Sequence, residues 1–402
     1  MAEPAKKKEK ISADCLLACL YLVCLPFTVV TTPIGSLLKV MTYPIVILLA
    51  VRYLMGKNEL VFNYIHLFYT LYILYSVGML LVYNDTMAMT TTKDMILGLL
   101  MLLLITLRVY NAREKEWLET AWILVGIVCI FAAITSTEVV SESENRAVVR
   151  ILGFEEDQNQ FCAYLIMPVL VSLKRIFEKR RFFALYVLIV LLAFYAILKT
   201  GSRGGLIGVC AGVAVYIFIG MKSLKARIAI ALAAVLTVLI FISVVMPMLP
   251  EDVSARYSVE AVREDGGSGR FEIWSFLLNY SAQRPERLAF GSGVFSTYPI
   301  MYSAGFRNGV AHNAYIQVLS DEGLAGLCLF LVCIVLCLVR NIKKDALYAC
   351  AMISLLAFSM SLSFYVFKPY LNIMMMCAMS FAGTLPQDRL TAVRNGGTVY
   401  DD

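Results

Sequence analysis

Arginine, serine and glycine lie together between two apolar segments and form the first group that could do chemistry. The stretch 200–205 reads Thr-Gly-Ser-Arg-Gly-Gly and joins an apolar run over 182–199 to another over 203–221. A helix N-terminus carries partial positive charge, so Arg203 is unfavourable there unless an anion lies nearby. Amides of the helix start, a cap from Ser202 and the guanidinium would together bind a phosphate. The alternative is an arginine that reaches the lipid headgroups.

A histidine opens the second group. His312 lies in the stretch 311–317, which reads Ala-His-Asn-Ala-Tyr-Ile-Gln and leads into a long apolar run. A helix N-terminus disfavours imidazolium, so we expect a neutral ring that can accept a proton near neutral pH. Asn313, Gln317 and Asp321 follow on one helical face, and lipid would leave such a stripe unsatisfied. The stripe therefore predicts a water-filled cavity or a polar ligand.

The segment 250–311 contains arginines and no lysine. A guanidinium matches two oxygens of a phosphate or carboxylate at once, whereas an ammonium acts as a point charge. Pairing with nearby acidic residues is the alternative for most of them. Arg270 is the best placed, because Phe271, Trp274 and Leu278 after it predict a short helix on the membrane surface. The arginines of this segment are Arg256, Arg263, Arg270, Arg284, Arg287 and Arg307.

Composition shows which elements must position these residues. The 402 residues are 60% hydrophobic and 16% charged, with a mean hydropathy of +0.76. Soluble domains are nearer ~25% charged, so the excess of apolar residues indicates surface that faces lipid. We therefore predict an all-α polytopic membrane protein. His66 falls inside one of the apolar runs and is interpreted as a packing or hydrogen-bonding residue.

Apolar runs bounded by charged or turn residues predict about twelve transmembrane helices. Basic clusters at 174–181, 222–227 and 340–344 fall on the side that holds both termini, which the positive-inside rule makes the cytoplasm. The expected spans are 14–30, 35–55, 61–83, 94–110, 117–135, 159–177, 182–199, 203–221, 226–249, 315–339, 345–367 and 369–384.

The expected organisation follows from these spans. A large extracytoplasmic loop with short helices joins the ninth and tenth spans and forms part of the site. The parts are a basic cytoplasmic N-terminus (1–13), helices one to nine (14–249), the loop (250–311), helices ten to twelve (312–384) and a cytoplasmic tail (385–402). We expect the site to lie on the extracytoplasmic face of the membrane.

Several function classes are not supported. The net charge of +6 is explained by topology, so no nucleic-acid partner is expected. The cysteines lie in or at the ends of apolar runs, which supports neither a disulfide framework nor a zinc site. The two halves show no evident repeat, which weighs against the common transporter plans. We expect no metal and no cofactor.

Four motifs in order resemble the O-antigen ligase and Wzy-type polymerase superfamily. They are Thr-Gly-Ser-Arg-Gly-Gly at 200–205, Gly-Arg with a following Trp at 269–274, Gly-Ser-Gly-Val-Phe at 291–295, and His-Asn-x-Tyr-x-Gln with Glu-Gly-Leu-x-Gly at 312–326. The stretch 153–165, which contains Asn159, is also similar to a segment of that family. The motifs cover roughly residues 150–340.

The resemblance implies a membrane glycosyltransferase that uses an undecaprenyl-diphosphate-linked glycan as donor and a glycan or lipid A core as acceptor. Arg203 and Arg270 would stabilise the diphosphate leaving group, and His312 would act as a general base or hold the substrate. Further contacts to the substrate would come from Ser202, Asn159, Asn313, Gln317 and Arg287. Ligation to lipid A core, polymerisation of repeat units and glycosylation of protein stay open, with a preference for the first two.

Two other functions fit the same helices. A transporter or flippase of lipid-linked glycan needs no transferase chemistry, but it predicts charges near the bilayer midplane, where the expected spans hold almost none. A scaffold without chemistry would use the arginines of 250–311 as headgroup contacts and would tolerate substitution of His312. The oligomeric state is not specified by the sequence.

Overall fold

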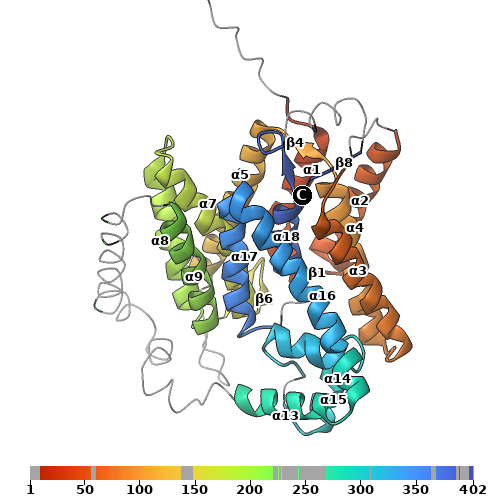
Figure 1. Cartoon of the computed structure of the whole chain (residues 1–402). Coiled ribbons are helices and arrows are strands. Elements are labelled where there is room, and N and C mark those ends of the chain that lie inside the picture. Colours follow the sequence, from red (N-terminus) through yellow and green to blue (C-terminus); the bar gives the residue numbers. More distant parts are fainter. Residues whose placement is uncertain are drawn as a thin grey trace, which may run out of the picture.

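The computed structural model is mostly helical, as predicted (Figure 1). It describes residues 10–55, 60–136, 148–220, 225, 228, 243, 269–307, 309–363, 368–385, 389 and 398–401. The first half contains α1 (Ala13–Val23), η1 (Leu25–Thr28), β1 (Thr31–Thr32), β2 (Gly35–Ser36), α2 (Leu37–Met55), β3 (Val61–Phe62), α3 (Tyr64–Gly78), η2 (Met79–Leu81), α4 (Thr86–Thr106), β4 (Val109–Tyr110) and α5 (Ala112–Thr135).

The second half begins with a hairpin and ends with a short strand. It contains β5 (Val149–Ile151), β6 (Phe154–Glu156), α6 (Gln158–Tyr164), α7 (Ile166–Phe177), α8 (Phe183–Lys199), α9 (Arg203–Gly220), α13 (Arg270–Ala282), α14 (Pro285–Phe290), α15 (Thr297–Ser303), α16 (Ala314–Lys344), α17 (Ala346–Ser359), α18 (Lys368–Ala378), β7 (Ser380–Phe381) and β8 (Val399–Tyr400). The strands form only two-stranded pairings, among them β3 with β8 and β4 with β7.

Seven helices in the described residues are long and apolar enough to cross a membrane, and three shorter apolar helices accompany them. The count of twelve stays a prediction, and the expected span 226–249 lies almost wholly outside the described residues. The span expected at 94–110 begins earlier, since α4 starts at Thr86. Its early threonines fit a helix because their hydroxyls donate to carbonyls one turn back, as from Thr92 to Ala88.

Small residues let α9 and α17 pack closely. Gly204, Gly208 and Gly212 lie four residues apart on one face of α9. A Cβ on Gly204 would lie 2.0 Å from Ser361 Oγ, and one on Gly212 would lie 2.7 Å from the Cys350 carbonyl oxygen. Such spacing is typical of helix pairs in membranes. Gly204 of the 200–205 motif therefore serves helix packing, whereas the sequence predicted only a phosphate-binding role for this motif.

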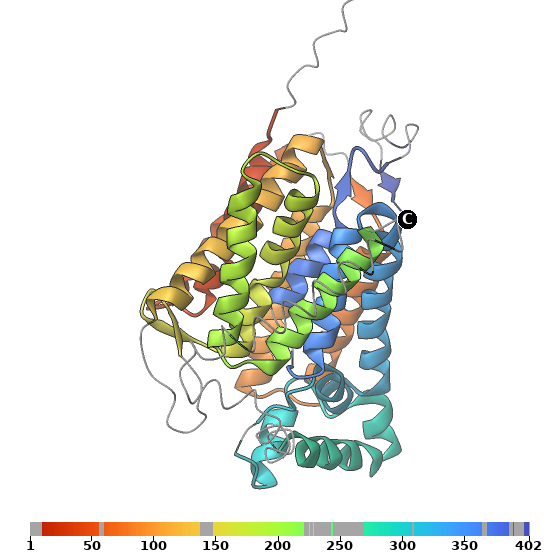
Figure 2. The same cartoon turned by 90° about the vertical axis from the view of Figure 1, so that its left-hand side faces the viewer.

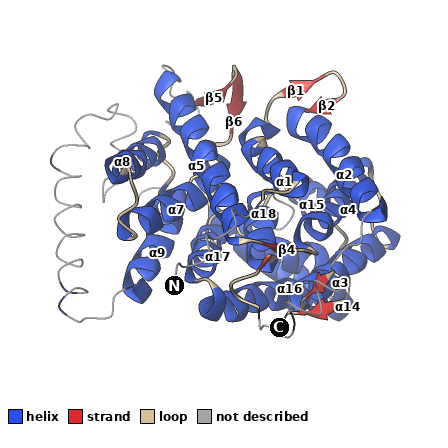
Figure 3. Ribbon diagram, turned by 90° about the horizontal axis from the view of Figure 1, so that it is seen from above, coloured by secondary structure: helices blue, strands red, loops and turns tan. Residues whose placement is uncertain are grey.

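The core of the bundle surrounds α18, which lies among the other helices when seen from above (Figure 3). Tyr370, Met374 and Cys377 are almost fully buried. Helices α5, α7, α8 and α9 lie on one side of α17 and α18 in that view, and α2, α3 and α4 lie on the other.

The bundle has two different ends. The first and last described residues lie at one of them, which we call the terminal end (Figure 1): Ser12 bonds to Glu114 there, and β4 pairs with β7. Helices α13, α14 and α15 lie at the opposite end, which we call the loop end, and α13 runs across the bundle axis (Figure 2). The helix predicted to start at Arg270 is thus confirmed.

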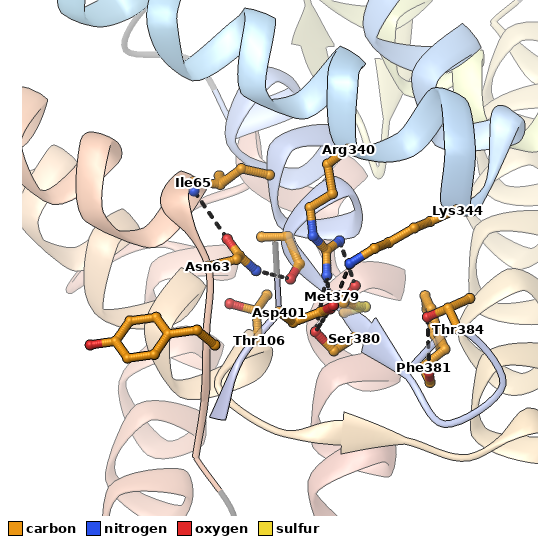
Figure 4. Close-up of polar contacts among 12 residues, drawn as sticks. Asn63, Ile65, Thr106, Arg340, Lys344, Met379, Ser380, Phe381, Thr384 and Asp401 are labelled. Carbon is orange, nitrogen blue, oxygen red and sulfur yellow. Dashed lines mark hydrogen bonds and ion pairs between the residues drawn. The ribbon is translucent and has the colours of Figure 1, made fainter. Parts of the chain in front are cut away.

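Charged side chains close the terminal end (Figure 4). Arg340 donates to the Cys377 and Met379 carbonyls at 2.7 and 3.0 Å and to Ser380 Oγ at 3.0 Å, and it pairs with Asp401. Asp401 also pairs with Lys344 and is 1% exposed. The segment expected as a tail therefore includes residues that are packed into the bundle.

Candidate functional site

The 200–205 motif forms a corner between two helices. Ser202 caps α9, because its Oγ accepts from the Gly205 amide at 3.0 Å. The same hydroxyl donates to Asn159 Oδ1 of α6 at 2.7 Å, and both residues are buried. Two side chains predicted to contact substrate thus bond to each other. Their shared role is to fix the start of α9, where Arg203 is partly exposed.

The C-terminal end of α17 joins this corner to the histidine motif. Ser361 packs against Gly204, next to Arg203. One residue earlier, the Met360 carbonyl accepts from Asn313 Nδ2 at 3.4 Å. The fold therefore brings the segments of Arg203 and His312, which are far apart in sequence, to opposite sides of the same short turn.

The backbone at His312 is in the left-handed region, with φ of +51°. Few residues other than glycine adopt this conformation, and it persists only where the surroundings hold it. Ala311 is held on both sides: its amide donates to Gln317 Oε1 at 2.8 Å, and its carbonyl accepts from Trp274 Nε1 at 2.9 Å. On the other flank, Asn313 caps α16 through Oδ1. The histidine is thus positioned by bonds to both of its neighbours.

Trp274 also links α13 to the histidine motif. It lies one helical turn after Arg270, which starts α13 behind Gly269 at φ +71°. The bond from Trp274 to Ala311 therefore places the first turn of α13 beside His312. Arg270 and His312 are both partly buried. The loop motif and the histidine motif accordingly belong to one assembly.

The polar stripe of α16, for which a water-filled cavity or a polar ligand was predicted, bonds to neighbouring residues of the protein. Gln317 Nε2 donates to Asp321 Oδ2 at 2.9 Å, and Ser363 Oγ donates to Gln317 Oε1 at 3.2 Å. Asp321 Oδ1 accepts from the amide and the hydroxyl of Thr297, both at 2.7 Å. The reason is that the loop folds back over the helix start and supplies the donors, which helical periodicity alone could not indicate.

Helix α16 is broken at Gly323, whose φ and ψ are 68° and −168°. The break frees carbonyls that a continuous helix would use. The Ser292 amide donates to the Ser320 carbonyl at 3.1 Å, and the Gly293 amide donates to that of Asp321 at 2.8 Å. Amides of the turn at 291–293 thus satisfy carbonyls that the break leaves free. A Cβ on Gly323 would lie 2.4 Å from the Gly291 amide nitrogen, so this approach requires glycine.

A known family model matches part of the chain. Residues 188–331 match the family model described as O-antigen ligase. The resemblance to the O-antigen ligase and Wzy superfamily is confirmed. The match covers just over a third of the chain, from α8 to the middle of α16, and includes Arg203, Arg270 and His312. No curated protein matches the chain.

The match to the O-antigen ligase family model, together with the apolar helices, indicates a multi-pass membrane protein with glycosyltransferase-like chemistry. Asn159 lies outside the matched residues, but its bond to Ser202 ties it to them. The ligase match also includes Arg287, whose position differs from that of the other candidates. Arg287 donates to the Tyr280 carbonyl at 2.7 Å and lies over the Tyr280 ring at 3.7 Å. Tyr280 is ten residues beyond Arg270, or about 15 Å along α13.

Sequence reasoning missed some residues of the site and correctly interpreted one residue outside it. Trp274 and Asp321 were noted only as parts of patterns, although an indole and a carboxylate in apolar surroundings signal a need for hydrogen-bond partners. Ser361 and Ser363 gave no signal. His66 is confirmed as a hydrogen-bonding residue: its Nδ1 accepts from the Asn63 amide at 3.1 Å, and its Nε2 lies 2.7 Å from Thr106 Oγ1.

Proposed function

We propose that the protein transfers glycan from an undecaprenyl-diphosphate carrier to an acceptor at the outer face of the plasma membrane, as an O-antigen ligase or a surface-polysaccharide polymerase. The observation that carries the proposal is the convergence of the motifs on one turn. The segments of Arg203 and His312 both pack against residues 360–363, and Trp274 attaches the segment of Arg270. The loop end is then the extracytoplasmic end, and both termini are cytoplasmic.

The chemistry assigned to this assembly is a displacement at the anomeric carbon of the donor sugar. An acceptor hydroxyl forms the new glycosidic bond, and the bond from that carbon to the diphosphate oxygen breaks. Negative charge develops on the leaving diphosphate, and guanidinium groups of Arg203 and Arg270 stabilise it without a metal. His312 accepts the hydroxyl proton or holds the acceptor by hydrogen bonding.

The remaining predicted contacts take supporting roles in this proposal. Asn159 and Ser202 fix the helix start that carries Arg203. Asn313 and Gln317 hold the backbone on either side of His312. A side chain that holds a catalytic group in place lowers the rate when it is removed, even though it never touches substrate. Arg287 contacts Tyr280 near the end of α13, and it has no assigned role in the reaction.

Purified protein in liposomes tests the proposal. The substrate is an undecaprenyl-diphosphate glycan, supplied with and without lipid A core, and the product is analysed for new glycosidic bonds. Growth of the chain identifies a polymerase, and product that requires the core identifies a ligase. Arg203→Ala, Arg270→Ala and His312→Ala should each abolish transfer. Arg284→Ala, in an exposed arginine that precedes α14, is the matched control and should retain it.

Two outcomes would overturn the proposal. Full transfer by all three alanine variants would remove the assigned chemistry. Movement of labelled glycan lipid across the liposome membrane without any new glycosidic bond would identify a flippase instead.

A further inference from the structure

A cavity of about 380 Å³ lies beside the candidate site and is not part of it. This volume is within the ~300–1,000 Å³ that small-molecule sites occupy. Most of its lining residues are apolar, and Thr135, Ser136 and Arg150 are the polar ones. The lining residues are Phe27, Val128, Phe131, Ala132, Thr135, Ser136, Val148, Arg150, Ile151, Leu152 and Gly153.

The lining shows how deep the cavity lies. Val128, Phe131, Ala132 and Thr135 recur on one face of the last two turns of α5, and the hairpin of β5 and β6 covers them. Two helical turns span about 11 Å. The cavity therefore follows a partly exposed face of α5 for about two turns from its end, at the depth of the outer lipid leaflet if the loop end is extracytoplasmic.

A lysine joins the rim of the cavity to the candidate site. Lys199 Nζ donates to the carbonyls of Ala133 and Ser136, each at 2.7 Å, and Ser136 lines the cavity. Lys199 is the last residue of α8, four residues before Arg203, so the two cannot lie more than about 14 Å apart. An ammonium has three donors, and the third can reach an anion between the cavity and Arg203.

The hairpin provides a second connection. Its strand β6 ends at Glu156 and leads directly into α6, where Asn159 accepts from Ser202. Arg150 adds a second cation to the rim and pairs with Glu155 at 2.9 Å. Both partners are largely exposed, and an exposed pair of this kind is weak enough to exchange for another anion.

We propose that this cavity holds the first isoprenoid units of the lipid carrier, next to the diphosphate that Arg203 would bind. This assignment rests on the proposed function. A mostly apolar cavity with Arg150 in its lining, and with Lys199 bonded to the lining residue Ser136, matches a ligand that joins a hydrocarbon chain to a dianionic headgroup. A neutral lipid would use only the apolar lining, and a soluble sugar nucleotide would use only the cations.

Kinetics with two donors tests the assignment. The donors carry the same glycan diphosphate, one on undecaprenol and one on a two-isoprene alcohol. Thr135→Trp fills the mouth of the cavity from an exposed position, so the fold should persist. KM for the undecaprenyl donor should rise about tenfold, which corresponds to ~1.4 kcal/mol of lost binding, while kcat and KM for the short donor stay nearly constant. Ile134→Trp, exposed on α5 outside the cavity, is the matched control.

Photo-crosslinking in the wild-type protein separates this proposal from the transferase proposal. A polyprenyl diphosphate with a diazirine on its first isoprene should label peptides from 128–136 or 148–153, whether or not transfer occurs. Excess unlabelled polyprenyl diphosphate should remove the label. Labelling removed by phospholipid alone would overturn the assignment, as would equal kinetic effects of Thr135→Trp on both donors. A wild-type protein that labels but does not transfer would contradict only the proposed function.

Discussion

The two ends of α16 solve the problem of polar groups in an apolar bundle in different ways. At the terminal end, Arg340 and Lys344 pair with Asp401, and backbone carbonyls and Ser380 take further donors of Arg340. At the loop end His312, with positive φ, lies two residues before the helix, and Gln317 and Trp274 hold its neighbour Ala311. Charges pair with each other in a buried cluster at the terminal end, whereas Arg203, Arg270 and His312 at the loop end are partly exposed.

The difference distinguishes a structural cluster from a site. Paired charges that are almost fully buried cannot reach a substrate, and their removal should affect folding. A strained backbone conformation costs roughly 1–3 kcal/mol, and proteins retain such strain mainly where function needs it. Substitutions at the loop end should therefore lower activity more than stability, and substitutions at the terminal end should do the reverse.

The largest effect is expected at His312. His312→Asn keeps a residue type that tolerates positive φ, so the melting temperature should change little. Transfer should fall about 10²–10⁴-fold, the range that a general acid or base contributes. Single-turnover transfer and thermal unfolding in detergent measure the two quantities. Unchanged transfer by this variant would remove the functional side of the comparison.

The second effect concerns the terminal end. Arg340→Leu leaves Asp401 buried beside Lys344 alone and should lower the free energy of unfolding by about 3–5 kcal/mol. Transfer per folded molecule should stay at the wild-type rate. The double variant with Asp401→Asn should recover part of the stability, because the buried carboxylate that lost its arginine partner is then removed as well. A loss of transfer at full stability would show that the two ends are not separable as argued.

Much of the fold could be predicted because its signals are local. Apolar runs and capping residues such as Asn63, Asp85 and Asn111 mark helix starts, and each of these side chains accepts from the first turn of its helix. The break at Gly323 could not be placed within a continuous apolar run. It depends on the glycine turn at 291–293, which is distant in sequence.

The candidate site was predictable in its residue types but not in its connections. Arg203, Arg270 and His312 were singled out because each is unusual where it stands. The bond from Ser202 to Asn159 and the bond from Trp274 to Ala311 join residues more than thirty positions apart. Only the packing of the start of α9 on α6 and the return of the loop onto α16 create these contacts. For the same reason Gln317 was read as a ligand contact, although its amide is used within the protein.

A smaller effect is expected at Gln317, whose side chain accepts a bond from Ala311, the residue before the histidine. Gln317→Leu removes the acceptor for the Ala311 amide and should cost about 1–3 kcal/mol of stability, the range for an unsatisfied buried group. Looser positioning of His312 should also lower kcat and leave KM for the donor nearly unchanged. Asn372→Leu is a matched control, since it removes a buried amide elsewhere in the core. A rise in KM alone would indicate that Gln317 contacts substrate.

The smallest effect is a pH dependence confined to the terminal end. Burial would raise the pKa of Asp401, but the charge of Arg340 and the bonds from Lys344 and Ser380 outweigh it and hold the pKa below its usual value. A lowered pKa in the folded state means that the carboxylate stabilises the fold above its unfolded pKa of about 4, and that this contribution disappears as the pH falls through the folded value. The stability difference between wild type and Asp401→Asn should thus be constant from neutral pH down to about pH 5 and shrink below about pH 4. Thermal unfolding of both proteins across this range measures it. A difference that instead shrinks between pH 6 and 8 would mean that the cluster does not hold an ionised Asp401, and the contrast between the two ends would lose its electrostatic basis.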